Sequence, residues 1–362
     1  NLQLAVFAAL NILANNKFPL IGALAFSGML SIKSLMNFFK YSILVLTMCI
    51  SGCSSLISNY ISSQQSYGYE NIASDKSLFQ QGYVKSEYCS EKHSNCISYL
   101  KAKPLNDKRF LRYDVAIDVN KKTENIHLEL TKKELPNIFK GTIVLVHGFR
   151  ASKEFMANSA LYFRFLGFNV IAPDLLGHGD SSGKISFGVK SAQIINELLK
   201  NNADIEYPLY VLGNSMGAVA ASYLAKENDN ISGVILQAPM TIFDKATVNY
   251  ALSYSPIISM LFSEKTIRQS AIKALDNANV SVEQTDIKPM LSGVNTPVMI
   301  LASTNDPVAP FAYFKSLSNN NVSVFKIDNR SHPGMNIIGN KEHLYIQEWL
   351  ISKANKSLKQ DK

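Results

Sequence analysis

Short, β-branched apolar runs that alternate with helix-length stretches are the feature that most constrains the fold of this chain. Continuous runs of this kind suit strands buried on both faces of a parallel sheet, and strand–helix alternation is typical of a doubly wound α/β domain. The runs are Thr142–Val146, Asn169–Ala172, Leu209–Gly213, Ser232–Gln237, Pro297–Ala302 and Val322–Ile327. The helix-length stretches lie at about residues 153–166, 187–201, 216–227, 309–318 and 340–355. We therefore predict an α/β fold with a mostly parallel, doubly wound sheet.

Two regions depart from this alternation of strands and helices. Arg112–Asn120 and Glu124–Thr131 alternate polar and apolar residues, as the strands of a half-exposed hairpin do. A long interval at about residues 240–294 reads as helical pieces interrupted by Pro256 and Pro289. Because ligands bind beyond the carboxyl ends of parallel strands, we predict that this interval is a small helical cap over a site there.

These patterns divide the chain into three parts. Residues 1–52 are expected to be a leader, with a signal peptide that starts at Met36. Residues 53–111 are expected to be a polar tether and N-terminal extension, because the tract up to about residue 80 is rich in Ser, Gln and Tyr. The α/β domain is predicted to cover residues 112–356.

The leader has the layout of a secretion signal. After Met36 come a charged region with Lys40, an apolar run and small residues before Cys53. The tetrapeptide Ile50-Ser51-Gly52-Cys53 resembles the lipobox of bacterial lipoproteins, which implies lipidation at Cys53 and a lipid-anchored protein of the bacterial cell envelope. The alternative is an uncleaved N-terminal transmembrane anchor, although the apolar run from Tyr41 to Gly52 is shorter than the roughly 20 residues that span a bilayer.

Charge argues against a nucleic-acid partner. The formal net charge is +8, from 36 Lys and Arg against 28 Asp and Glu. Three of the lysines, Lys17, Lys33 and Lys40, lie in the first 52 residues, which contain no acid. The rest of the chain has only a mild excess of positive charge and no run of basic residues interleaved with aromatics.

Cysteine use indicates one local bridge. Cys89 and Cys96 lie on either side of His93. In an oxidising compartment a disulfide between them is the favoured interpretation, while free thiols and a metal site with few ligands are the alternatives.

A sharp turn after one predicted strand carries the main chemical signal. Gly213-Asn214-Ser215-Met216-Gly217 matches the G-x-S-x-G pattern between a buried strand and a helix-forming stretch. Glycines on both sides let strand and helix approach closely, so the Ser215 hydroxyl stands clear of the sheet at a helix N-terminus. Ser215 is the predicted nucleophile.

A serine nucleophile needs a base that a carboxylate orients. His332 lies on a loop just beyond a strand and is the predicted base, whereas His343 falls inside the last predicted helix and is expected at the surface. Asp306 also follows a strand and is the predicted acid, with Asp244 as its main rival.

Acyl transfer also requires donors for a developing oxyanion. Val146-His147-Gly148-Phe149 follows a strand, and the backbone amides of Phe149 and Met216 are the expected pair. We expect His147 itself to brace the loop and to transfer no proton.

Residues 112–356 resemble the α/β-hydrolase superfamily, in particular its serine-hydrolase branch of esterases, monoacylglycerol-lipase-like and serine aminopeptidase-like enzymes. The resemblance rests on the elbow at Ser215, on H-G-F at 147–149, on P-D-L-L-G-H-G-D-S-S-G at 173–183, and on the order of the Asp306 and His332 loops. It implies that His178 is structural. The chain departs from common patterns at Arg150, where many lipases have Gly, and at Asn214, where His is common.

The resemblance implies a serine hydrolase of carboxylic esters that acts on a small-molecule or lipid ester without a metal or organic cofactor, and the lipobox-like sequence at Cys53 implies that this enzyme is tethered to a membrane. A peptidase, thioesterase or acyltransferase with the same triad is the alternative, and a lipoprotein that uses the fold without catalysis is a third interpretation.

Overall fold

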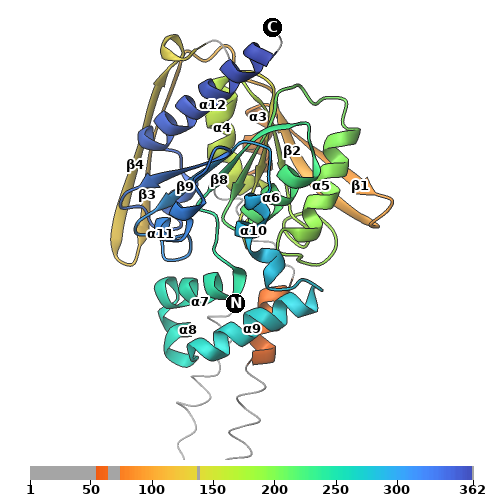
Figure 1. Ribbon diagram of the computed structural model, residues 1–362, viewed down its shortest axis with the longest axis vertical. Helices are drawn as coiled ribbons and strands as arrows, with labels where there is room; N and C mark the ends of the chain where they lie inside the picture. Colours follow the sequence, from red (N-terminus) through yellow and green to blue (C-terminus); the bar gives the residue numbers. More distant parts are fainter. Residues whose placement is uncertain (1–53, 64–73, 137–138, 361–362) are drawn as a thin grey trace, which may run out of the picture. The chain divides into compact units, whose positions relative to one another are not determined.

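An eight-stranded sheet forms the centre of the domain in this computed structural model, which describes residues 54–63, 74–136 and 139–360. In spatial order its strands are β1 (Tyr83–Ser90), β2 (Asn95–Ala102), β6 (Asn169–Pro173), β5 (Thr142–Val146), β7 (Leu209–Asn214), β8 (Ile231–Gln237), β9 (Val298–Ser303) and β10 (Val322–Ile327). The last six pair in parallel, and β2 joins β6 in an antiparallel pair (Figure 1). The predicted mostly parallel α/β sheet is confirmed.

The start of the domain was predicted too late. The β1–β2 hairpin adds two strands to the sheet edge, so the sheet begins at Tyr83 and not at residue 112. The predicted polar tether also contains a helix over residues 54–62 and the short helix α3 (Asp75–Gln80). The sequence hides β1 because it is an edge strand, with most of its residues half-buried or exposed, and it therefore reads as polar.

Helices cover both faces of the sheet. α4 (Ala157–Leu166) and α12 (Asn340–Gln360) lie together on one face, where the Tyr162 hydroxyl meets His343 Nδ1 at 2.8 Å. α5 (Val189–Asn201), α6 (Gly217–Glu227) and α10 (Ile287–Ser292) pack together on the other face (Figure 1). This follows from the strand order, because the chain moves from β5 to β6 in one direction and then crosses back to β7, and right-handed connections place the two crossovers on opposite faces.

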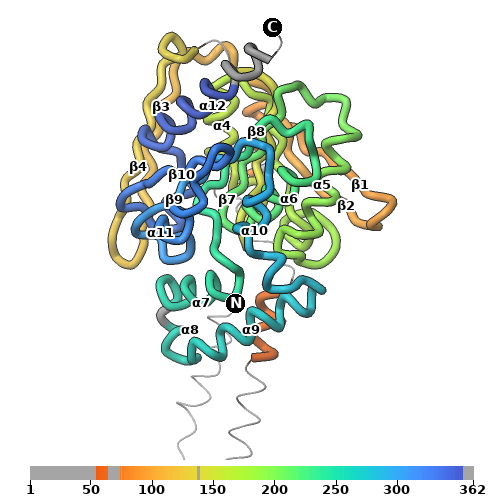
Figure 2. The backbone as a smooth tube through the Cα atoms, viewed as in Figure 1, coloured from red at the N-terminus to blue at the C-terminus, as the bar shows by residue number. Residues whose placement is uncertain are grey.

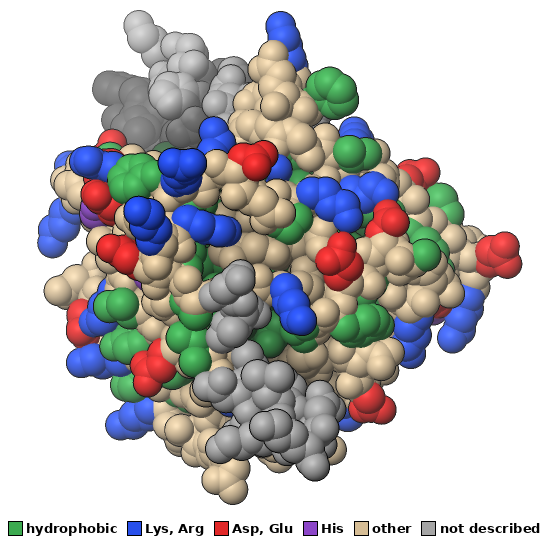
Figure 3. Space-filling model, turned by 90° about the horizontal axis from the view of Figure 1, so that it is seen from above, with side chains coloured by type: hydrophobic (Ala, Val, Ile, Leu, Met, Phe, Trp, Pro, Cys, Tyr) green, Lys and Arg blue, Asp and Glu red, His purple; other side chains and the backbone are tan. Residues whose placement is uncertain are grey.

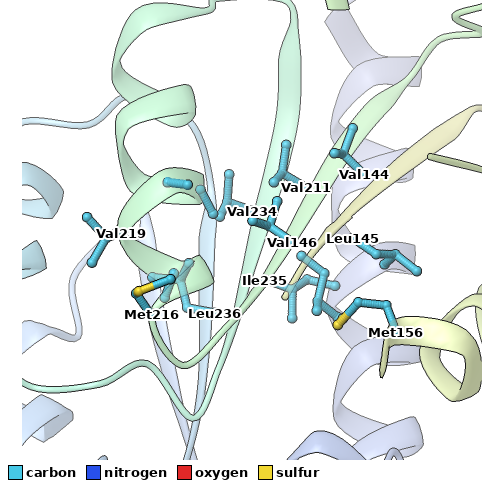
Figure 4. Packing of buried hydrophobic residues seen from close by; sticks show 14 of the residues in the cluster. Val144, Leu145, Val146, Met156, Val211, Met216, Val219, Val234, Ile235 and Leu236 are labelled. Carbon is cyan, nitrogen blue, oxygen red and sulfur yellow. The ribbon is translucent and has the colours of Figure 1, made fainter. Parts of the chain in front are cut away.

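The strands have apolar side chains on both faces, so the sheet needs a layer of helices on each side. Leu145 and Ile235 lie on the side of Met156, which precedes α4, whereas Leu236 lies beside Met216 at the start of α6 (Figure 4). All five are fully buried. Burial on two faces gives the continuous apolar runs that predicted these strands.

The predicted cap is present as a group of helices between β8 and β9. It consists of α7 (Phe243–Tyr254), α8 (Pro256–Leu261) and α9 (Glu264–Asn277), followed by a 3₁₀ turn at Glu283–Thr285 and by α10. α8 begins at Pro256, as the first turn of a helix permits, and the Ser263 hydroxyl caps α9 by accepting from the Thr266 amide at 3.2 Å. Pro289 does not interrupt a helix, because it lies in the first turn of α10.

The predicted hairpin before the parallel strands forms a separate two-stranded sheet of β3 (Phe110–Val119) and β4 (Lys122–Thr131). It runs beside α12 (Figure 2), and the Tyr113 hydroxyl donates to the Ile338 carbonyl at 2.5 Å. The helix predicted at 309–318 is shorter than expected. Only α11 (Phe311–Phe314) and a 3₁₀ turn (Lys315–Leu317) form, because Pro310 still pairs with Ser303 at the end of β9.

Charged side chains are mixed on the face shown in Figure 3. Lys and Arg lie among Asp and Glu over this surface, with small hydrophobic areas between them. This mixture agrees with the mild excess of positive charge in residues 53–362.

Candidate active site

The turn after β7 has the strained geometry that its glycines predict. Ser215 has φ of +51°, a left-handed conformation that side chains other than glycine rarely adopt. A Cβ on Gly217 would lie 2.3 Å from the Val146 carbonyl oxygen, and one on Gly213 would lie 2.5 Å from the Gly217 carbonyl oxygen. No side chain fits at either position, so the two glycines let α6 start directly against the strands.

The structure brings the three predicted catalytic side chains together. Ser215 Oγ lies 2.8 Å from His332 Nε2, and His332 Nδ1 lies 2.7 Å from Asp306 Oδ2. An ionised carboxylate can only accept a hydrogen bond, so His332 carries its proton on Nδ1, which donates to Asp306. His332 Nε2 is then free to accept from the Ser215 hydroxyl. Such an arrangement can take a proton from the hydroxyl as it attacks.

Asp306 is fixed by its own loop. Its Oδ1 accepts from the backbone amides of Val308 and Ala309 at 2.8 and 2.9 Å, while Oδ2 faces the imidazole. The carboxylate is buried, and the His332 side chain is only 12% exposed. The rival Asp244 lies in the first turn of α7, where its Oδ2 meets Arg268 Nη1 at 3.1 Å within the cap.

The expected oxyanion loop lies against the nucleophile. A Cβ on Gly148 would be 3.2 Å from the Ser215 Cβ, so the backbone of this loop passes directly beside Ser215. Phe149 and Met216, whose amides are the expected donors, follow β5 and β7. These two neighbouring parallel strands lead into helices on opposite faces of the sheet, and this switch point is where open α/β sheets bind ligands. The Phe149 ring packs against the Phe187 and Phe243 rings, which also contact each other.

The remaining buried histidines are structural. His147 Nε2 accepts from the Leu175 amide at 3.0 Å and so braces the loop, as expected. Burial lowers the pKa of His147 to about 4 and that of His178 to about 3, which keeps both neutral at pH 7. The expectation that His343 lies at the surface was wrong. His343 is buried against Tyr162, and burial lowers its pKa to about 4.

Two residues that the sequence did not single out hold the His332 loop from outside. Glu124 of β4 accepts from the Ser331 amide through Oε1 at 2.8 Å, and its Oε2 is buried beside Gly334. The Tyr254 hydroxyl, at the end of α7, accepts from the His332 amide at 3.1 Å. Burial raises the pKa of Tyr254 to about 12, and the nearby carboxylates of Asp306 and Glu124 add to this effect. No local sequence motif marks either residue.

The other predicted sites lie apart from this centre. Cys89 and Cys96 are opposite each other in the β1–β2 pair and form a disulfide. Within the described residues, the one group of side chains with possible metal ligands is Glu87 with these two cysteines, whose sulfurs are already bonded to each other. Cys53 lies outside the described residues. The part of the chain that the structure describes contains no helix of the length and apolarity that a membrane crossing requires.

Comparisons with known proteins find similar chains among hydrolases. The family described as serine aminopeptidase, S33, matches residues 138–298. Protein ABHD12B from Homo sapiens is 27% identical over 157 residues, which are 42% of this chain and 41% of that protein. Lipase 1 from Psychrobacter immobilis is 34% identical over 104 residues, 28% of this chain and 32% of the lipase. The chain therefore spans less than half the length of these curated relatives.

A solved structure extends the likeness over most of the chain. The crystal structure of a membrane phospholipase A, described as a bacterial virulence factor, superposes with a TM-score of 0.51 at 17% identity. The match covers 88% of this chain and 99% of that one, and at this identity it shows the shared fold. Its parallel sheet, its G-x-S-x-G turn after β7 and these matches show that the chain has the α/β-hydrolase fold and is similar to serine aminopeptidase, lipase and esterase members of that superfamily.

Proposed function

We propose that this protein is a carboxylic-ester hydrolase that works through an acyl-enzyme on Ser215. The observation that carries the proposal is the hydrogen-bonded chain from Ser215 through His332 to Asp306, built on a strained turn. The likeness to a lipase in sequence supports an ester as the substrate.

The geometry suits a two-step reaction. Ser215 Oγ attacks the ester carbonyl while His332 Nε2 takes its proton, and Asp306 stabilises the resulting imidazolium. The amides of Phe149 and Met216 donate to the oxyanion. His332 then returns the proton to the departing alkoxide, which leaves as the alcohol. Water attacks the acyl-enzyme by the same route, so that the acid is released and Ser215 regains its proton.

The cap and the helix at 54–62 expose several large apolar side chains. Six of the exposed large hydrophobic side chains lie on the cap or on the helix at 54–62, and Met260 is 87% exposed. They are Leu56, Tyr250, Leu252, Ile257, Met260 and Leu261. Since exposed apolar side chains that are concentrated in one part of a protein often serve binding, we propose that the substrate carries an acyl chain, as a lipid ester does.

A fluorophosphonate probe combined with p-nitrophenyl esters of increasing chain length tests this proposal. We expect the wild-type protein to be labelled and to turn over the esters, with a preference for acyl chains longer than acetyl. Ser215→Ala should lose both activities while it unfolds at the wild-type temperature. Absence of wild-type labelling, or labelling that persists in Ser215→Ala, would refute the proposal.

One observation favours a second candidate. The matching family is described as serine aminopeptidase, and the same triad can attack an amide. Aminoacyl p-nitroanilides measured beside the esters separate the two activities, because kcat/KM for the preferred class should exceed that for the other by orders of magnitude.

We further propose that Cys53 is lipidated and that the protein is anchored in the bacterial cell envelope. The Ile50-Ser51-Gly52-Cys53 sequence supports this, together with the apolar side chains on the cap and on the helix that follows Cys53. In a bacterial host grown with labelled palmitate, the wild-type protein should carry the label in the membrane fraction, and Cys53→Ala should not. Equal membrane association without label in both proteins would instead support a spanning anchor.

A further inference from the structure

Arg150 occupies a backbone position that favours glycine. It directly follows Phe149, whose amide is one of the two proposed oxyanion donors, and its φ is +59°. A side chain in the left-handed region costs conformational energy. The departure from glycine at this position therefore calls for a compensating contact.

The compensating contact comes from the helix at residues 54–62. The Arg150 guanidinium lies 3.7 Å from the centre of the Tyr60 ring, and its Nη2 donates to the Tyr60 carbonyl at 2.9 Å. The same guanidinium lies 5.5 Å from the centre of the Phe149 ring. A cation over an aromatic face and a charged hydrogen bond are both favourable. They join this helix to the loop that carries the proposed oxyanion donor.

The helix at 54–62 is itself firmly seated. Ile61 and Ser58 are buried, and two side chains of α9 reach the helix. Lys273 Nζ donates to Ser55 Oγ at 2.7 Å, and Asn277 Nδ2 donates to Ser58 Oγ at 3.3 Å. Figure 1 shows this helix beside α9, beneath the sheet domain. The helix therefore contacts both the cap and the loop after β5.

We infer that the helix at 54–62 positions the oxyanion loop, with Arg150 and Tyr60 as the positioning residues. The inference rests on the proposed ester hydrolysis. An oxyanion donor stabilises the transition state only if its amide lies at the correct distance from the developing charge. Arg150 keeps the Phe149 amide in place because its guanidinium is held at a second point, on Tyr60. A segment that the sequence marks as a solvated tether thereby becomes part of the catalytic framework.

Three variants separate this contact from the conformation of the loop. Arg150→Gly keeps the left-handed backbone easy to adopt but removes the guanidinium. Tyr60→Ala removes the ring and leaves the carbonyl, whereas Tyr60→Phe retains both and should behave as wild type. We expect Arg150→Gly to lower kcat for p-nitrophenyl butyrate by roughly 10- to 100-fold, which is less than the loss of a whole oxyanion donor. Tyr60→Ala should lower kcat less, and KM should change by less than about twofold in both, since ground-state binding is retained.

Arg164→Ala is the matched control. The Arg164 guanidinium lies 4.6 Å from the centre of the Tyr83 ring, and its Nε donates to the Lys103 carbonyl at 2.8 Å. It makes the same two kinds of contact at the end of α4, but with Tyr83 of β1 and Lys103 after β2 and not with the helix at 54–62. This variant should lower the melting temperature and keep the wild-type kcat.

The experiment measures kcat, KM, the fluorophosphonate labelling rate and the melting temperature for all five proteins. A kcat loss in Arg150→Gly and Tyr60→Ala, matched by slower labelling and absent in Tyr60→Phe and Arg164→Ala, supports the inference. Wild-type kcat in Arg150→Gly and Tyr60→Ala overturns it, as does an equal loss in Arg164→Ala. If the wild-type protein itself shows no Ser215-dependent turnover, the proposed function fails first, and the inference fails with it.

Discussion

The nucleophile and the base of the proposed triad are held in different ways. Ser215 and Asp306 follow strands inside the sheet, and their own loops fix them, through the close approach of Gly217 to β5 and through the amides after Asp306. His332 follows β10, at the edge of the sheet, and elements outside the sheet hold its loop through Glu124 and Tyr254.

The difference indicates that the geometry of the proposed triad depends on two levels of structure. The sheet alone supplies the proposed nucleophile and the proposed acid. The alignment of the base requires that the β3–β4 hairpin and the cap also be in place. Changes in the first region should therefore remove chemistry, whereas changes in the second should weaken it by degrees.

The largest effect should come from Asp306→Asn. Without the carboxylate, the imidazole loses the partner that fixes its tautomer, and kcat for a p-nitrophenyl ester should fall by about 10⁴-fold. Asp244→Asn is the control, because Asp244 is paired with Arg268 inside the cap, and its kcat should stay close to the wild-type value. The opposite order of losses would exchange the roles of the two aspartates.

Glu124→Ala tests the hairpin as a support for the base. Loss of the acceptor for the Ser331 amide should let the His332 loop shift and lower kcat by roughly 100-fold with little change in KM. Glu124→Gln keeps an oxygen acceptor and should recover most of the activity. Glu129→Ala, on the same strand but exposed, is the control for strand stability. Equal kcat in all three would show that the sheet alone aligns His332.

Tyr254→Phe tests the cap in the same way with a smaller change. The ring remains, and only the oxygen that accepts from the His332 amide is lost. We expect kcat to fall by about tenfold, because one backbone hydrogen bond of the loop is removed. Tyr250→Phe, one turn earlier in α7, should leave kcat unchanged. An unchanged kcat in Tyr254→Phe would leave the hairpin as the single support.

The smallest effect concerns stability rather than rate. Burial lowers the pKa of His343 to about 4, below the usual value of 6.5, so the unfolded chain binds more protons between pH 6.5 and 4. Stability is therefore complete above pH 6.5 and falls as the pH drops through this window. Between pH 7 and pH 5.5, His343 should account for about 1 kcal/mol of the loss. Urea unfolding of wild type and His343→Gln at both pH values checks this, and parallel pH dependence in the two proteins would contradict it.

Prediction from the sequence succeeded where the signal was local. The parallel strands are marked by continuous apolar runs, and the turn at Ser215 is marked by glycines whose positions leave no room for a side chain. Asp306 and His332 were predicted to lie near Ser215 because each follows a strand, and parallel strands end at the same edge of the sheet; the structure brings the three side chains together.

Prediction failed where a residue's surroundings come from distant parts of the chain. His343 was expected at the surface because a helix pattern does not reveal that Tyr162 covers it, and the β1–β2 hairpin was missed because edge strands read as polar.

The sequence by itself determined the sheet, the strained turn and the three side chains of the proposed triad, because each depends on neighbouring residues and on strand ends. Only the tertiary structure decided how those side chains are held. Glu124 meets Ser331 across 207 residues, and Arg150 meets Tyr60 across 90. Contacts over such separations depend on how the β3–β4 hairpin, the cap and the helix at 54–62 pack against the sheet, and no local sequence pattern encodes them.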